Sequence, residues 1–170
     1  MLILAMDPSG SFIEGKGTTG YSLWYAGEYA PITVGELAAK DYATQQDYWN
    51  AHINLINVIK PDILVIEDYL LYADKAKQQI GSKMETSQML GIIKYECSKK
   101  NRKIIMQKAV EVKTRFNDDI LTNLEILECV NNRYYISTRS GRRLITSRHI
   151  RDSIRHYMLY DLKKRKGKYE

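Results

Sequence analysis

Four side chains in this sequence have the types and the placement that metal-assisted chemistry requires. Asp7 and Glu67 each follow a short run of apolar residues, and His149 precedes Asp152 by three positions. Carboxylate oxygens and an imidazole nitrogen are suitable ligands for Mg²⁺ or Mn²⁺. Two such ions about 3.5–4 Å apart stabilise the attacking and leaving oxygens of a phosphodiester during in-line displacement. The set therefore predicts a site for two divalent ions.

Buried strands are the elements that must position the two acids. Residues 2–6 are apolar without interruption and end at Asp7, where a proline follows and removes a backbone donor. Residues 63–66 form a second apolar run, which ends at Glu67. Ligands of open α/β sheets bind at the carboxyl ends of strands, so we expect the two acids to share one site. Alternation along the second strand places Asp68 on the opposite face, in a structural role.

A helix is predicted from Ser147, a favourable N-cap residue, to about residue 164. At 100° per residue, His149, Asp152 and His156 fall within about 60° of one another on a face beside the apolar stripe. The pattern alone leaves two interpretations of this face, a functional one and a solvated surface. His156 has the same two interpretations, as a neighbour of the site or as an exposed residue.

The rest of the chain alternates between strand and helix patterns, and it predicts an α/β fold with a mixed central sheet flanked by helices. We expect one domain over residues 1–170, with a basic β-hairpin that turns at Ser140-Gly141. The predicted strands cover 21–25, 29–37 and 103–107. The predicted helices cover 44–60, 110–116 and 117–130, and a further helix is opened by a capping box at 82–85 and runs to about residue 99. The hairpin covers 133–146.

Composition indicates a globular protein. Of the 170 residues, 44% are hydrophobic and 27% are charged, which excludes a disordered chain, and no apolar run approaches the roughly 20 residues of a membrane span. The N-terminus lacks the pattern of a signal peptide. Cys97 and Cys129 lie in helix-like patterns without metal-finger spacing, so we expect core thiols, a reducing compartment and a cytoplasmic location.

Positive charge is concentrated in the second half of the chain, although the net charge is only +6. A tight hairpin cannot bury several guanidinium groups cheaply, so its arginines are expected to face a polyanion, while the basic tail at 163–170 is expected to be flexible. An acid cluster beside a basic surface indicates a nuclease. The residues predicted to contact DNA are Tyr69 and Leu70, which follow Glu67, and Arg139, Arg142, Arg143, Arg148 and Arg151.

In their order and spacing, these segments resemble the RuvC-type Holliday junction resolvases, which have the RNase H-like fold. The matching pieces cover nearly the whole chain: Leu4-Ala5-Met6-Asp7-Pro8-Ser9 with Thr19-Gly20-Tyr21-Ser22, Pro61 to Glu67, the helix around Gly91, Val112-Lys113, and His149-Ile150-Arg151-Asp152-Ser153.

The resemblance implies a homodimer that cuts branched DNA with Mg²⁺ or Mn²⁺, two ions per site. It assigns Asp7, Glu67 and Asp152 as metal ligands. His149 becomes the fourth site residue, because members of the family carry an acid or a histidine three residues before the last aspartate. Lys113 matches a family lysine that contacts the scissile region. The hairpin at 133–146 departs from the family pattern, and this departure resembles a phage-borne member.

Two other functional classes share parts of this pattern. Nucleotide-binding ATPases and sugar kinases have a similar fold and a glycine-rich loop, but they need two such domains, and the loop at 10–20 lacks the ending of a P-loop. A nuclease-dead scaffold that only binds nucleic acid would lack one of the acids, whereas all are present here. His52 is a further histidine outside these motifs. It lies on the apolar edge of the predicted helix 44–60, so we expect it to be a core histidine rather than a ligand.

Overall fold

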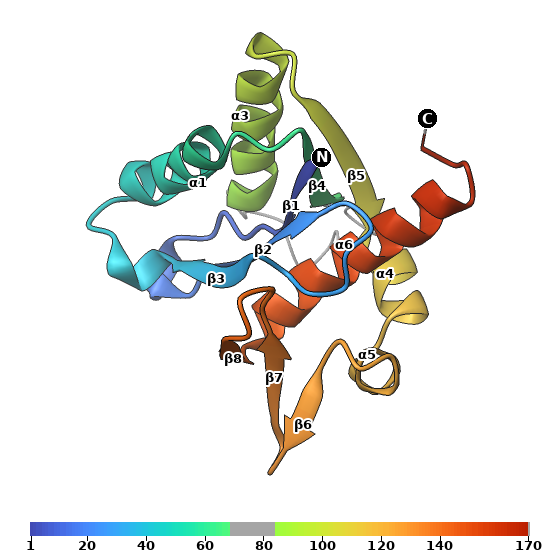
Figure 1. Ribbon diagram of the computed structural model, residues 1–170. Coiled ribbons are helices and arrows are strands. Elements are labelled where there is room, and N and C mark those ends of the chain that lie inside the picture. Colours follow the sequence, from blue (N-terminus) through green and yellow to red (C-terminus); the bar gives the residue numbers. More distant parts are fainter. Residues whose placement is uncertain (69–83, 170) are drawn as a thin grey trace.

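A five-stranded mixed sheet forms the centre of the molecule (Figure 1). The computed structural model describes residues 1–68 and 84–169, so the predicted DNA contacts Tyr69 and Leu70 lie outside the described residues. The strand order is β3-β2-β1-β4-β5, with β1 parallel to β4, β4 parallel to β5, and the pairs β1–β2 and β2–β3 antiparallel. The strands are β1 (Leu2–Asp7), β2 (Thr18–Tyr25), β3 (Thr33–Ala38), β4 (Ile63–Asp68) and β5 (Lys103–Lys108).

Helices cover both faces of this sheet, and the alternation of side chains along β1 decides what each face contacts. Leu4 and Met6 belong to a core with α1 (Gln45–Ile59) and α3 (Glu85–Lys99). The intervening residues of β1 belong to a second core, which contains α6 (Arg148–Arg165). The predicted α/β fold with a mixed, helix-flanked sheet is confirmed. The short elements are η1 (Ile13–Gly15), η2 (Ala39–Asp41), α4 (Ala109–Arg115) and α5 (Asp118–Asn123).

The basic hairpin is part of a separate three-stranded antiparallel sheet of β6 (Glu128–Val130), β7 (Arg133–Ser137) and β8 (Arg143–Thr146). The predicted helix over 117–130 is therefore wrong beyond α5. Glu125 has a φ of 58°, which breaks the helical path, and Asn131 and Asn132 have φ values of 51° and 59°. Asparagine tolerates this left-handed conformation, and two such residues in succession form the turn between β6 and β7.

Two smaller predictions are also wrong. Cys97 is buried as expected, but Cys129 is exposed, because it lies on β6 rather than on a packed helix. A glycine in the middle of a helix favours close packing on a neighbour, yet a Cβ built on Gly91 of α3 would have no atom within 4 Å. Helix α3 begins at Glu85 after Met84, and Ser82 lies outside the described residues. Within the described part of the chain, no helix is both long and apolar enough to cross a membrane.

The loop after Asp7 is fixed by a buried polar network. His52 is fully buried, with Nδ1 2.8 Å from the Tyr48 carbonyl oxygen and Nε2 2.7 Å from Thr19 Oγ1. The hydroxyl of Tyr48 donates to the carbonyl of Ser9, and the backbone N–H of Ser9 donates to Thr19 Oγ1. The predicted core histidine is confirmed, and its hydrogen bonds hold the chain two residues after Asp7.

Burial lowers the pKa of His52 from 6.5 to about 4, against a smaller opposing effect of its hydrogen bond to Tyr48. The unfolded chain protonates this side chain near pH 6.5, but the folded chain does so only near pH 4. The free energy of unfolding should therefore fall as pH drops through this window, by about 3 kcal/mol at most. Urea denaturation at several pH values should show a shallower decline in His52→Gln than in the wild type. Parallel declines would contradict this assignment.

Candidate metal centre

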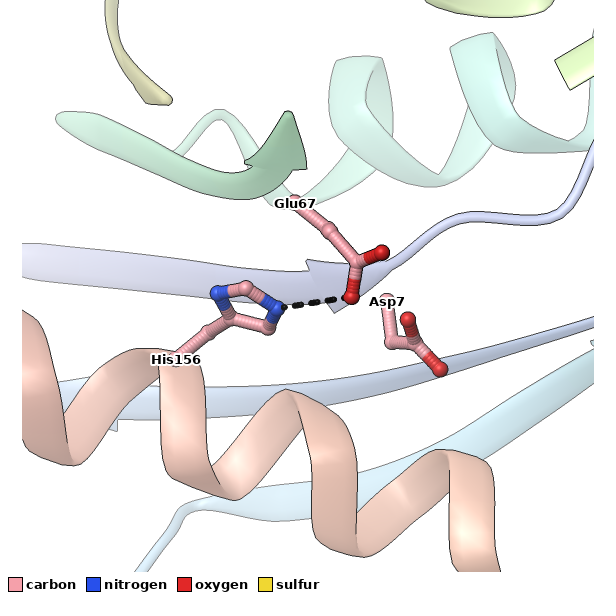
Figure 2. Close-up of side chains that lie close together, drawn as sticks. All are labelled: Asp7, Glu67 and His156. Atoms are coloured by element: carbon pink, nitrogen blue, oxygen red, sulfur yellow. Dashed lines mark ion pairs between the residues drawn. The ribbon is translucent and has the colours of Figure 1, made fainter. Parts of the chain in front are cut away.

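Asp7 and Glu67 meet at the carboxyl ends of two adjacent parallel strands. Met6 pairs with Ile66 in the β1–β4 register, so the next residue of each strand is an acid. Figure 2 shows their carboxylates close together, with the imidazole of His156 from α6 facing Glu67. One ligand atom from each of these three side chains lies within 4.8 Å of the other two. The strand ends thus form one cluster of groups that can bind a metal ion.

Gly20 allows the start of α6 to approach this cluster. Gly20 pairs with Asp7 in the β1–β2 register. A Cβ on Gly20 would lie 2.0 Å from the carbonyl oxygen of His149, so only glycine permits the helix backbone to lie on β2 here. The contact places His149 Nδ1 3.3 Å from Asp7 Oδ2.

The first turns of α6 present three polar side chains to the sheet. Ser147 is the N-cap, and its side chain accepts a hydrogen bond from the N–H of Ile150, as predicted. His149 faces Asp7, whereas His156, two turns later, has Nε2 3.5 Å from Glu67 Oε2.

Asp152 is almost completely buried, and cations surround its carboxylate. Arg155 donates to its Oδ1, and the Nζ of Lys113 lies 3.5 Å from its Oδ2. Arg155 also donates to Asp118 of α5. Within the described residues, Asp152 is not part of the cluster formed by Asp7, Glu67 and His156. No local pattern in the sequence predicts the pairing of Arg155 with Asp118, because this pairing depends on where α5 packs.

Burial and neighbouring charges alter the proton affinities of the site. Burial raises the pKa of Asp7, and the charges of Glu67 and Asp152 raise it further, against the hydrogen bond from His149. Burial also acts to raise the pKa of Glu67, but interactions led by the neighbouring imidazole of His156 lower it overall. The hydrogen bond to Asp7 raises the pKa of His149, despite the opposing effect of burial.

These features suit a divalent cation. Asp7 and Glu67 supply hard oxygen ligands at one point, and their mutual repulsion is relieved by a positive ion between them. His149 and Asp152 lie along the same helix face, close to this point. The donor set is that of a Mg²⁺ or Mn²⁺ site.

Three of the five arginines predicted to contact DNA form ion pairs within the protein. Arg139 lies 3.6 Å from Glu28, Arg143 lies 2.8 Å from Glu128, and Arg151 lies 2.9 Å from Asp118. The remaining two, Arg142 and Arg148, are exposed and form no ion pair with any described residue.

A cation-rich hollow of about 260 Å³ opens beside Asp152. Four cationic side chains line it, so it suits an anion such as a phosphate. The hollow is lined by Lys113, Asn117, Asp118, Arg148, Arg151, Asp152 and Arg155.

Comparison with known proteins identifies the fold. No family profile and no curated protein sequence matches the chain. Among solved structures, RuvC of Thermus thermophilus has a TM-score of 0.65 at 10% identity, covering 99% of this chain and 98% of its own. The same protein in complex with a Holliday junction substrate has a TM-score of 0.64 at 11% identity, with 98% and 96% covered. The chain therefore has the RuvC-like, RNase H-like fold that its sequence predicted.

The raised pKa of Asp7 has a consequence for stability. The folded state binds a proton at Asp7 more tightly than the unfolded chain does, so the charged carboxylate destabilises the fold at neutral pH. In EDTA, Asp7→Asn should raise Tm by about 2–4 °C for each kcal/mol relieved. Mg²⁺ should then raise the Tm of the wild type but not of the variant.

Differential scanning calorimetry measures both effects, and the exposed substitution Asp41→Asn is the control that should change neither. A lower Tm for Asp7→Asn in EDTA, or an undiminished response to Mg²⁺, would contradict this account of the site.

Proposed function

We propose that this protein is a metal-dependent endonuclease that resolves Holliday junctions or other branched DNA by hydrolysing phosphodiester bonds. The observation that carries the proposal is the meeting of Asp7 and Glu67 at adjacent strand ends, directly under the helix face that bears His149 and Asp152. The RuvC-like fold supports the same conclusion, because the RuvC structure with this fold is a complex with a Holliday junction.

In this proposal, Asp7, Glu67, His149 and Asp152 hold two Mg²⁺ or Mn²⁺ ions. When bound, the ions supply stabilisation of the attacking and leaving oxygens of the phosphodiester. His149 must be neutral to bind a cation, so its raised pKa makes cation binding improve as pH rises. Asp152 must exchange its contact with Arg155 for the ion, and Arg155 then keeps Asp118 as a partner.

The substrate is assigned from the cations around the hollow beside Asp152. Lys113 and Arg148 line it, and Arg148 is free of ion pairs with described residues. A DNA phosphate next to the scissile bond would satisfy both side chains, and it would place the reacting phosphorus close to the acids. Lys113 then has the role of a residue that contacts the scissile region.

A branched substrate with two-fold symmetry requires two cuts, so we also infer a homodimer with two equivalent sites. Light scattering at micromolar concentration, with and without junction DNA, should give twice the mass of the chain. A monomer under both conditions would exclude this assembly.

Removing one acid should separate cutting from binding. Glu67→Gln takes away a metal ligand but no part of the basic surface that supplies most of the affinity for nucleic acid. We expect cleavage of labelled four-way junctions to be abolished while the Kd for junction DNA stays within about twofold. The assay should include duplex, flap and three-way substrates, because equal cutting of all of them would reject junction selectivity. Wild-type protein that binds junctions without cutting them would instead support a nuclease-dead scaffold.

The unpaired arginine at the hollow should contribute to the salt dependence of binding. If Arg148 neutralises one phosphate, Arg148→Ala should reduce the slope of log Kd against log salt by about one unit. Arg165, at the far end of the same helix, is paired with Asp161, so Arg165→Ala is a matched control that should leave the slope unchanged. Fluorescence anisotropy at several salt concentrations measures both slopes. Equal slopes for the wild type and Arg148→Ala would remove Arg148 from the DNA contact.

A further inference from the structure

His156 is the one member of the cluster in Figure 2 whose role the proposed nuclease chemistry does not assign. Its side chain is almost completely buried, and it lies one turn beyond Asp152 on α6. Its two ring nitrogens have different neighbours. Nδ1 lies 2.9 Å from the side-chain amide of Gln107, and Nε2 lies 3.5 Å from Glu67 Oε2. What His156 can do depends on which nitrogen carries the proton.

The amide of Gln107 decides this question. Gln107 is at the end of β5 and is 2% exposed, so its amide must find partners in the protein. Only one orientation satisfies both ends of this amide. In that orientation the nitrogen donates to the carbonyl oxygen of His156, at 3.1 Å, and to His156 Nδ1, and the oxygen accepts from the N–H of Tyr160, at 3.2 Å.

An Nδ1 that accepts a hydrogen bond carries no proton, so in the neutral ring the proton is on Nε2. The Nε2–H therefore points toward Glu67 Oε2. This oxygen is buried and has no hydrogen-bond partner within the usual distance among the described residues. Hydrogen bonds in the sites of free enzymes are often long and shorten when the site is loaded. The N–H of His156 is the group placed to satisfy this oxygen.

We infer that His156 is a positioning residue, held by Gln107 in its Nε2–H form, which fixes the carboxylate of Glu67 so that its other oxygen, Oε1, faces the metal ion. The inference rests on the proposed function, because it assigns a role to Glu67 as a ligand. It adds two buried residues, Gln107 and His156, to the site. Both act through Glu67 and neither needs to touch the ion.

The competing role for His156, as a direct ligand through Nε2, is disfavoured by the same amide. A ligating Nε2 carries no proton, so Nδ1 would have to donate to the oxygen of Gln107. Rotating the amide to present that oxygen would turn it toward the carbonyl oxygen of His156 and turn the amide nitrogen toward the N–H of Tyr160. Two acceptor oxygens would then face each other at about hydrogen-bond distance, and so would two N–H donors.

Nitrogen NMR of the histidine rings tests the inference directly. The chain has three histidines, so the long-range ¹H–¹⁵N spectrum of the ¹⁵N-labelled full chain is simple, and His156→Gln assigns the third ring. At about pH 8, where ordinary imidazoles are neutral, His156 should show a protonated Nε2 and a bare Nδ1. This pattern should persist when Mg²⁺ is added without DNA. A protonated Nδ1, or a change of tautomer on adding Mg²⁺, would overturn the inference in favour of direct ligation.

A variant tests whether the contact of Gln107 with His156 affects the affinity for the metal ion. Gln107→Leu should release the tautomer of His156 and weaken Mg²⁺ binding by about tenfold in calorimetric titration, as losses of groups behind metal ligands do. Gln46→Leu, on the exposed face of α1, is the control that should change neither. Unchanged affinity in Gln107→Leu with a mixed tautomer would overturn the positioning role. If Gln107→Leu fails to fold, the wild-type spectrum still decides the tautomer.

The failure of this inference differs from the failure of the nuclease proposal. The tautomer and the Mg²⁺ affinity are measured without DNA. A protein with the expected tautomer that cuts no DNA would reject only the proposed reaction. A protein that cuts junctions while His156 ligates the ion through Nε2 would reject only the positioning role.

Discussion

Helix α6 packs across the sheet with most of its length buried, and this contact fixes the geometry of the polar site. Trp24 of β2 stacks on Tyr157 with ring centroids 4.1 Å apart and planes within 3°. Ile154 is fully buried in the same core. A stacked aromatic pair and a buried aliphatic side chain leave the helix little freedom to slide or rotate. The positions of His149 and Asp152 over the strand ends are therefore set by apolar packing.

This packing also buries polar groups, which must be compensated. Asp152, Arg155, His156 and Asp161 are all buried on α6. Burying an unpaired charge costs several kcal/mol, so each of these groups has a partner. Arg155 joins Asp152 to α5, and His156 joins α6 to β5 through the amide at its end. The charged network around Asp152 thus ties α4 and α5 to α6, and the contact of His156 with Gln107 ties α6 to the sheet.

The sequence predicted those parts of the site that follow from local pattern. Two apolar runs that end in acids gave the strands with Asp7 and Glu67, and a serine before an amphipathic stretch gave the start of α6. Periodicity says which face a residue occupies but does not say which segment lies across from it. No local pattern in the sequence therefore predicts the pairing of Arg155 with Asp118 or the contact of Gln107 with His156. The error at β6 arose because Ile120, Leu124 and Leu127 fit a helical period, whereas the helix ends at Asn123.

The contact between Asp7 and His149 joins residues 142 positions apart in the chain. During synthesis, β1 leaves the ribosome early, and α6 follows on the order of ten seconds later at ordinary elongation rates. Until then, the face of the sheet on which α6 packs lacks this helix, and the two strand-end acids have no partner from α6. Chains that stall before α6 emerges can form neither the second core nor the complete site. Translation order therefore delays the assembly of the acid cluster until α6 has been made.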